Sequence, residues 1–505
     1  MYKHTELQFV MPDDFFLPFG GKLNKENRWV QLAFLIPWWK IEAHYASQFE
    51  PSHTGEQAMS VRVALGALII QQRLHLSDRE TVQQITENPY LQYFIGLPQF
   101  QENPPFHPSS LVHFRKRFPD DVINQVNDWI IAGEDKNDDP KARDGNGENA
   151  DKESDHDNGL EATNVEVVSP SEPENEATED APNQGKLLLD ATCTPADIAY
   201  PTDLSLLNEA REKLEHFIDL LHAPLRKEVP KPRTYREVAR KAYLTVAKQR
   251  RASERTIRKA VGQQLRFVDR DLRIVEKLKE QVGLTALSAR NHKLLLVISE
   301  LYRQQKEMHS KRIHRIEDRI VNLSQPHVRP IVRGKAKAAV EFGAKVSISV
   351  VDGFARMESL QWDSYNEGTT LKASVERYRE RYGCYPEAVL ADKIYRTREN
   401  LQYCKTHGIR LSGPALGRPA KEERKEQRRQ ARIDAAERNA VEGKFGEGKR
   451  IYGLGLIKAR LANTSATVIA VQLLVMNLER RLRLLFCRKF CPLFLILREE
   501  IGLAV

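Results

Sequence analysis

The hydrophobic positions near the start of the chain repeat with helical spacing. Val61, Leu65 and Leu68 follow one another at intervals of three or four residues within 59–74, which is typical of an amphipathic helix. Ser77 and Glu80 have the spacing of a capping box that opens a second helix. That helix runs through Thr86 and is stopped by the Asn-Pro pair at 88–89. We therefore predict an all-α N-terminal domain over residues 1–132.

A third helix is predicted to begin near Ser109 or Ser110. One of its faces is apolar and carries Leu111, Phe114 and Phe118. The opposite face carries a run of cations, Arg115, Lys116 and Arg117. A basic helix at the end of a compact helical module is typical of a DNA reader, but a solvated helix face has the same pattern. Both interpretations stay open at this point.

The pattern changes to strands after residue 186. Short apolar runs bounded by polar residues occupy 187–198, 344–354 and 387–392, as expected for buried β-strands. A long helical pattern, about 205–325, separates the first of these runs from the others, and further helices are predicted after the last run. This order predicts an α/β domain over 187–486, a mixed sheet flanked by helices, with a large all-α insertion and a C-terminal tail over 487–505.

The charge of the chain is unevenly distributed. The formal net charge is +9 and the pI is about 9.1. Residues 133–186 contain 17 acidic and 5 basic residues, a net −12, with few aromatics, so we predict an acidic disordered linker there. The remainder carries +21, because +9 is the sum of −12 and +21. Within the predicted insertion, residues 226–277 hold 17 basic and 6 acidic residues, a net +11, which favours contact with a nucleic-acid backbone.

Several classes of protein are disfavoured by composition. The five cysteines include no C-x-x-C pair, which argues against a disulfide framework or a zinc site. Neither a signal peptide nor an apolar run of about 18 residues is apparent. We therefore expect a cytoplasmic protein with no membrane partner.

Two acids follow apolar runs that are predicted to be strands. Asp190 comes directly after three leucines, and Asp392 follows the run 388–391. We interpret both as strand-end acids, held rigidly by the scaffold on one side and exposed on the other. An Asp at a strand end is also a common turn or cap residue, so each is a weak signal alone.

Other acids compete for the same role. The rivals are Asp197, Asp203, Asp352 and Glu447. Asp352 and Gly353 have the pattern of a hairpin turn, and Asp203 has that of a helix N-cap. Glu447 lies five residues after Glu442 and is expected to face elsewhere on its helix.

A third acid, Glu442, lies on a predicted helix between two cations. Arg438 precedes it by four residues and Lys449 follows it by seven. This arrangement suits a phosphate held beside a metal-binding carboxylate, although an ordinary surface ion pair has the same spacing.

Three ordered segments of the C-terminal half resemble insertion-sequence transposases whose RNase H-like DDE domain is interrupted by a helical insertion. LLLDATCTPADIAYPTD resembles the first-Asp segment. YPEAVLADKIYRTREN, which contains Lys393, resembles the second-Asp segment, and RNAVEGKFGEGK resembles the helix that carries the Glu. The family often has a Tyr three residues before the Arg of that helix, where this chain has Ala435.

The resemblance implies a function and a set of partners. Asp190, Asp392 and Glu442 are expected to bind two Mg²⁺ or Mn²⁺ ions and to carry out DNA cleavage and strand transfer. Arg438, Lys449 and Lys393 are expected to hold phosphates. The N-terminal domain and the basic insertion are expected to recognise terminal inverted repeats, in a homodimer assembled on DNA, without a small-molecule cofactor, in a prokaryotic cytoplasm and nucleoid.

Two alternatives share this sequence pattern. A decayed transposase would bind DNA as a repressor without catalysis, and a nuclease of the same fold would hydrolyse DNA but never join strands. A strand-transfer assay with pre-cut ends distinguishes these three functions.

Overall fold

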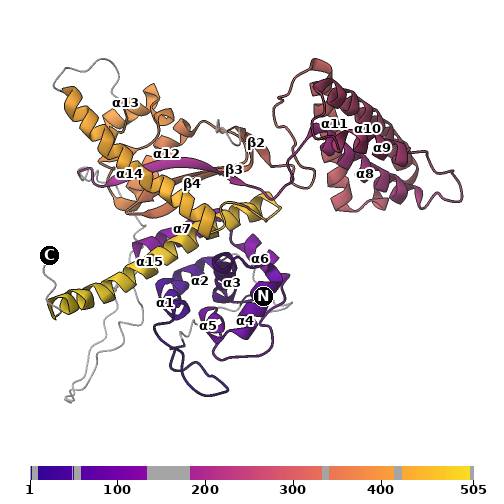
Figure 1. Cartoon of the computed structure of the whole chain (residues 1–505). Helices are drawn as coiled ribbons and strands as arrows, with labels where there is room; N and C mark the ends of the chain where they lie inside the picture. The colour runs from indigo at the N-terminus through magenta and orange to yellow at the C-terminus, as the bar shows by residue number, and fades with distance from the viewer. Residues whose placement is uncertain are drawn as a thin grey trace, which may run out of the picture.

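The computed structural model describes residues 2, 10–47, 49, 58–133, 182–332, 340–413 and 423–500. Most of the predicted acidic linker, residues 134–181, lies outside the described residues. The described parts form three bodies in Figure 1: a group of N-terminal helices, a mixed sheet with covering helices, and a separate helical bundle.

The N-terminal body is helical, as predicted. Its helices are α1 (Arg28–Leu35), α2 (Trp38–Ala46), α3 (Val61–Leu74), α4 (Asp78–Glu87), α5 (Pro89–Phe94), α6 (Ser110–Arg117) and α7 (Asp120–Ala132). Both hydrogen bonds of the predicted capping box, between Ser77 and Glu80, are present at the start of α4. The Asn-Pro pair ends α4, and Pro89 becomes the first residue of α5, where its missing N–H costs nothing.

The sheet has six strands and mixed direction. They are β1 (Lys186–Pro195), β2 (Arg329–Val332), β3 (Val340–Val351), β4 (Phe354–Gln361), β5 (Ala388–Leu390) and β6 (Arg410–Leu411). The strand order is β2-β3-β1-β5-β6, with β4 also paired to β3. The pairs made by β3 are antiparallel, whereas β1–β5 and β5–β6 are parallel. Asp352 and Gly353 join β3 to β4 with φ of 50° and 77°, which confirms the predicted hairpin turn.

Helices cover both faces of the sheet. On one face, Leu187 and Leu189 of β1 share a core with α12 (Leu371–Tyr382) and α13 (Arg398–Thr406). On the other face, strand residues such as Ile348 and Val350 share a core with Val441 of α14 (Glu423–Ile451). Two short 3₁₀ turns, η3 (Glu367–Thr370) and η4 (Lys393–Tyr395), lie against each other beside α12.

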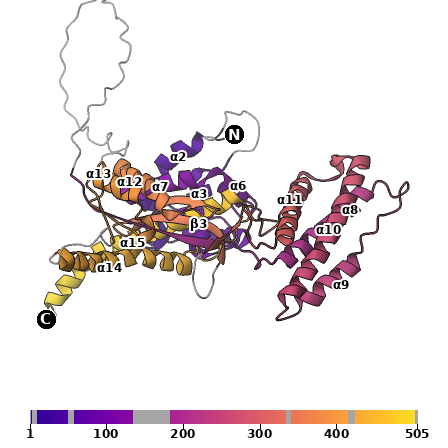
Figure 2. The same cartoon turned by 90° about the horizontal axis from the view of Figure 1, so that it is seen from above.

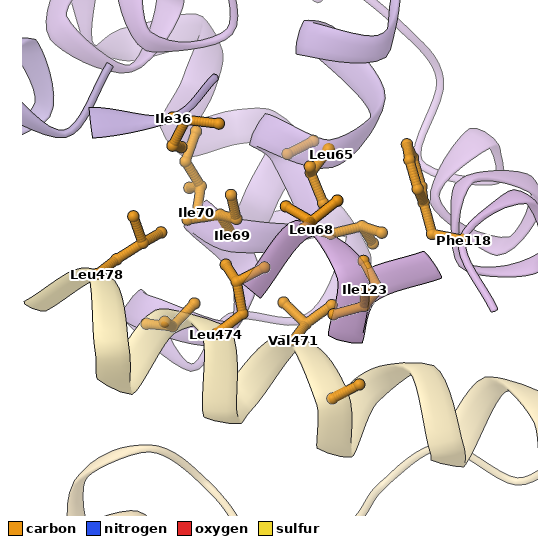
Figure 3. Close-up of a cluster of buried hydrophobic side chains, with 14 of the residues drawn as sticks. Ile36, Leu65, Leu68, Ile69, Ile70, Phe118, Ile123, Val471, Leu474 and Leu478 are labelled. Carbon is orange, nitrogen blue, oxygen red and sulfur yellow. The ribbon is translucent and has the colours of Figure 1, made fainter. Parts of the chain in front are cut away.

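The last helix, α15 (Ala462–Glu500), joins the sheet to the N-terminal body. Figure 3 shows Val471, Leu474 and Leu478 of α15 facing a group of apolar side chains from the N-terminal body, among them Leu68 and Ile123. All belong to one hydrophobic core that also contains the inner residues of β3 and β4. The N-terminal body and the sheet therefore pack as a single unit, because both bury apolar side chains against α15.

A buried asparagine stabilises this junction. The side-chain amide of Asn477 donates to Asn127 Oδ1 of α7 at 2.9 Å and to the carbonyl of Ala355 in β4 at 2.6 Å. Its Oδ1 accepts from the N–H of Ala355 at 3.0 Å. Asn477 thus hydrogen-bonds both bodies while it is fully buried.

The helical insertion forms the third body. It contains α8 (Asp203–His222), α9 (Arg236–Ala247), α10 (Glu254–Val282), the 3₁₀ turn η2 (Leu284–Ala286) and α11 (Ala289–Lys311). The bundle has its own apolar core and projects to one side of the molecule in both views (Figures 1 and 2). Its helices end at Lys311, earlier than the predicted boundary near 325, and an irregular segment leads back to β2. No helix among the described residues is long and apolar enough to cross a membrane.

Candidate active site

Asp190 lies in the middle of a strand, so the prediction that it ends a strand was wrong. It is the fifth of the ten residues of β1, which continues to Pro195 because β3 pairs with it throughout. The neighbouring strand on the other side is shorter, and its last pair with β1 is Leu188 with Leu390. Asp190 therefore lies just beyond the point where β5 stops. At Asp190, β1 is still paired with β3 on one side but is no longer paired with β5 on the other.

Asp392 leaves the sheet beside Asp190. Leu188 and Leu390 are paired in parallel register, and each of the two aspartates follows its leucine by two residues. Neighbouring strands are about 4.8 Å apart, and the charges of the two carboxylates interact. The prediction of a strand-end acid is confirmed for Asp392, which comes after β5 and caps η4, its Oδ1 accepting from the N–H of Lys393 at 2.7 Å.

The environment of Asp190 disfavours its charged form. Burial raises the pKa of Asp190 to about 6, and the negative charges of Glu367 and Asp392 also raise this pKa. The backbone N–H of Ala191 and the guanidinium of Arg438 act in the opposite direction. The N–H of Ala191 lies 2.8 Å from the Asp190 carboxylate. This carboxylate is thus held in a negatively charged, partly desolvated position, which a bound cation would stabilise.

Glu442 reaches the same region from α14. Lys186 at the start of β1 donates to both carboxylate oxygens of Glu437, at 2.8 and 2.9 Å, and this contact joins α14 to β1. Arg438, the next residue, points to the end of β5: its Nη1 lies 3.3 Å from Asp392, and its Nη2 lies 3.5 Å from Glu442. The side chains of Asp392 and Glu442 are 56% and 58% exposed, so both are open to a ligand.

A fourth carboxylate was missed by the sequence analysis. Glu367 of η3 forms an ion pair with Lys345 of β3 at 2.9 Å, and its side chain is only 18% exposed. The η3 turn is tied to η4, because the side chain of Asn400 donates to the carbonyls of Gly368 and Tyr395. Glu367 belongs to a segment without the strand-end pattern that identified the two aspartates, so the sequence carried no signal for it. The contact between η3 and η4 brings it near Asp190.

The remaining candidates divide between two places. Lys393 is exposed directly beside Asp392. Lys449 lies further along α14 and lines a groove that Arg115 of α6 also lines. Ala435, at the position where the resembled family often has a Tyr, is exposed on α14.

The basic helix α6 has the apolar face predicted for it, with Leu111, Phe114 and Phe118 buried. Two of its three cations have partners within the protein. Arg115 forms two hydrogen bonds with Asp78, at 2.9 and 2.8 Å, and Arg117 donates to the hydroxyl of Tyr45 at 3.1 Å. Lys116 is exposed.

The rival acids lie elsewhere. Glu447 forms ion pairs with Lys444 and Arg483, at 3.0 and 2.9 Å, and so faces away from Glu442, as expected. Asp203 is the first residue of α8, and the N-cap is Thr202, so the prediction that Asp203 caps the helix was wrong by one residue.

The donor chemistry of the site fits a divalent cation. Within the described parts of the chain, no three His, Cys, Asp or Glu side chains lie close enough together to bind one metal ion. The positive charge beside Asp392 and Glu442 is instead the Arg438 guanidinium. Carboxylate oxygens are the ligands that Mg²⁺ and Mn²⁺ prefer, and the half-buried carboxylate of Asp190 has no cation bonded to it among the described residues.

Two segments of the chain match known protein families. Residues 389–479 match a family model described as a transposase DDE domain, and residues 18–117 match a transposase domain, DUF772. The first match contains Asp392, Arg438, Glu442 and Lys449, and Asp190 lies outside it.

A similar curated protein comes from Rhizobium meliloti and is described as uncharacterized protein ORF8 in the nfe locus. It is 33% identical to this chain over 95 residues, which are 19% of this chain and 45% of that protein. The chain thus spans less than half the length of this relative. No solved structure matches the chain significantly.

Proposed function

Because its two family matches support an insertion-sequence DDE transposase, we propose that this chain cuts DNA at the ends of a mobile element and joins those ends to target DNA. One observation supports the proposal: Asp190 and Asp392 each follow by two residues the paired Leu188 and Leu390, and Arg438 lies 3.3 Å from Asp392 and 3.5 Å from Glu442. These relationships support a shared role for three acids from distant parts of the sequence.

Asp190, Asp392 and Glu442 would hold two Mg²⁺ or Mn²⁺ ions. Such ions activate the attacking oxygen and stabilise the leaving oxygen of a phosphodiester. The contribution of the protein is rigidity, since β1 and the capped η4 turn fix the two aspartates. Arg438 has the planar fork that binds phosphate with two hydrogen bonds, and exposed Lys393 adds a second cation beside the same carboxylates.

The order of elements supports an RNase H-like fold. Asp190 is on the first strand of the sheet, Asp392 follows β5, and Glu442 is on the later helix α14. The helical insertion accounts for the long separation of the two aspartates, because α8 to α11 lie between β1 and β2. The sheet is mixed, as this fold requires.

The charged surface of the insertion supports DNA as the partner. Arg240 and Lys241 of α9 and its C-cap residue Lys248 line a shallow groove of about 400 Å³. All three cations are exposed. We propose that this surface contacts the phosphate backbone near the terminal inverted repeats, in a homodimer on DNA within the prokaryotic cytoplasm and nucleoid, without a small-molecule cofactor.

The proposal is tested by Asp190→Ala in the full chain. We expect the variant to bind element-end DNA nearly as well as the wild-type protein and to lose cleavage and strand transfer. Asp197→Ala is the matched control, because Asp197 is an exposed acid seven residues further along the same segment. Cleavage by Asp190→Ala at the wild-type rate would refute the assignment.

A strand-transfer assay with pre-cut ends distinguishes the alternatives. Joining by the wild-type protein supports a transposase, hydrolysis without joining indicates a nuclease of the same fold, and DNA binding without either reaction indicates a repressor.

A further inference from the structure

A deep groove separates the N-terminal body from the segment that follows α14. Its volume is about 880 Å³. One wall is formed by the end of α3, the start of α4 and Arg115 of α6, and the other by residues between Lys449 and Gln472. We call this space the interlobe groove. Since α6 packs against α15 (Figure 1), residues from opposite ends of the sequence line it.

The interlobe groove is strongly basic. Its lining contains five cations, Arg115, Lys449, Arg450, Lys458 and Arg460, and one carboxylate, Asp78. Arg115 neutralises Asp78 through its two hydrogen bonds. Among the described residues, Lys458 and Arg460 are exposed and form no ion pair or hydrogen bond through their side chains, and Lys458 interacts with the charge of Glu80 only at longer range. Their charges are therefore available to an anionic partner.

One residue that lines the groove, Lys449, lies on the same helix as Glu442. Lys449 follows Glu442 by seven residues on α14, which is nearly two full turns, so both side chains lie on one face of the helix about 10 Å apart along its axis. A polyanion that binds Lys449 in the groove is thus one short step along α14 from Glu442.

The walls of the groove are held in place by specific contacts. His75 has a left-handed backbone with φ of 57°, and its Nε2 lies 2.6 Å from the carbonyl oxygen of Ile451. Gln472 donates to Gln72 across the groove at 3.1 Å. Gly453 has φ of 86°, and a Cβ there would lie 2.8 Å from Gln472. The turn after α14 therefore packs closely against the end of α3. These contacts fix the backbone that carries the basic side chains of the groove.

We propose that the interlobe groove binds the phosphate backbone of the DNA strand that enters the active site. The proposal rests on the proposed function and adds the path of the substrate. Unpaired cations attract a polyanion by charge and by release of its counterions. The exposed side chains of Leu456 and Leu461, at 47% and 55% exposure, lie among these cations and give sugars and bases an apolar surface. The N-terminal body thus forms one side of the DNA path.

The first test measures the salt dependence of DNA binding. The full-length double variant Lys458→Gln/Arg460→Gln is titrated with a fluorescein-labelled 30-bp duplex, and anisotropy is recorded over a range of salt concentrations. Loss of two phosphate contacts should lower the slope of log K against log[salt] by about 1.8, since each contact contributes about 0.9. Affinity should fall by about 10-fold or more at 0.1 M salt.

The matched control is Arg398→Gln/Lys405→Gln. Both residues are exposed on α13, neither lines the groove, and the change in net charge is identical. The control should keep the wild-type slope. Equal slopes for the groove variant and the wild-type protein would overturn the inference.

The second test locates the DNA. A photoreactive amino acid at position 456 should crosslink to the duplex, whereas the same group at position 19, where Phe19 is 87% exposed outside the groove, should not. Crosslinking of position 456 to protein alone would overturn the inference. If the groove variants bind and cleave like the wild-type protein while Asp190→Ala is inactive, the groove inference fails and the proposed function stands. If Asp190→Ala cleaves normally, the proposed function fails instead.

Discussion

Arg438 Nη1 lies 3.3 Å from the Oδ1 atom of Asp392. The same guanidinium reaches Glu442, four residues along α14, so one cation neutralises two of the three candidate metal ligands. Arg438 and a bound divalent cation would therefore interact with the same two carboxylates. A phosphate that binds Arg438 would draw it from the carboxylates, which would couple DNA binding to the affinity for metal.

Removal of Arg438 is expected to change metal affinity and joining in opposite directions. Arg438→Gln should bind Mn²⁺ several-fold more tightly, because two carboxylates lose their neutralising partner, and this is measured by calorimetry. Strand transfer should fall about 100-fold, because a phosphate-binding charge is lost. Arg438→Lys keeps the charge and should retain most of the wild-type Mn²⁺ affinity. A weaker affinity for Mn²⁺ in Arg438→Gln would contradict this interpretation.

Glu367 is expected to support the Asp190 carboxylate electrostatically. Glu367→Gln should weaken Mn²⁺ binding about 10-fold, as loss of a group beside the ligands commonly does, and calorimetry measures this change. The change also leaves Lys345 without its 2.9 Å partner. The double variant Lys345→Met/Glu367→Gln separates the two effects. Restored Mn²⁺ affinity in the double variant would show that Glu367 only neutralises Lys345.

Asn477 is expected to connect the stability of the N-terminal body to that of the sheet. Asn477→Ala removes three buried hydrogen bonds to Asn127 and Ala355, and should lower the free energy of unfolding by roughly 2–4 kcal/mol. Hydrogen exchange should accelerate together in α7 and β4. Asn463→Ala is the control, since Asn463 is an exposed residue of the same helix. Faster exchange in only one of the two elements would argue against a shared unit.

The insertion is expected to lose stability as the pH rises. Asp271 of α10 is fully buried, and neither of its carboxylate oxygens has a hydrogen-bond partner among the described residues. Burial raises the pKa of Asp271 to about 7, with a smaller contribution from the charge of Glu215, against the opposing charges of Arg270, Arg211 and Arg236. Because the folded state keeps a proton that the unfolded state releases near pH 4, stability is greatest below pH 4 for this group and is lost as the pH rises to about 7.

Asp271→Asn should remove this dependence. The wild-type insertion should lose up to about 1.4 kcal/mol per pH unit between pH 4 and 7 relative to the variant. Hydrogen exchange of α8 and α10, corrected for its intrinsic pH dependence, measures the difference. Parallel stability profiles for the two proteins would show that folding does not raise the pKa of Asp271.

Local patterns predicted the elements well where neighbouring residues decide them. The capping box at Ser77, the hairpin turn at Asp352 and the apolar face of α6 are all present, because each depends on residues within one or two turns of chain. The end of the insertion helices at Lys311 was predicted too late, since the helical pattern continues into residues that fold back to the sheet.

The sequence alone predicted the three candidate acids and fixed their order along the chain, because these depend on apolar runs, spacing and motif. Tertiary structure decided where each of them lies. The position of Asp190 within β1 depends on which strand pairs with each of its edges, and no local pattern encodes that choice. The place of Glu367 depends on the contact of η3 with η4. The interlobe groove exists because α15 buries the apolar faces of helices more than 300 residues away in the chain, and such long-range packing arises only when the whole core assembles.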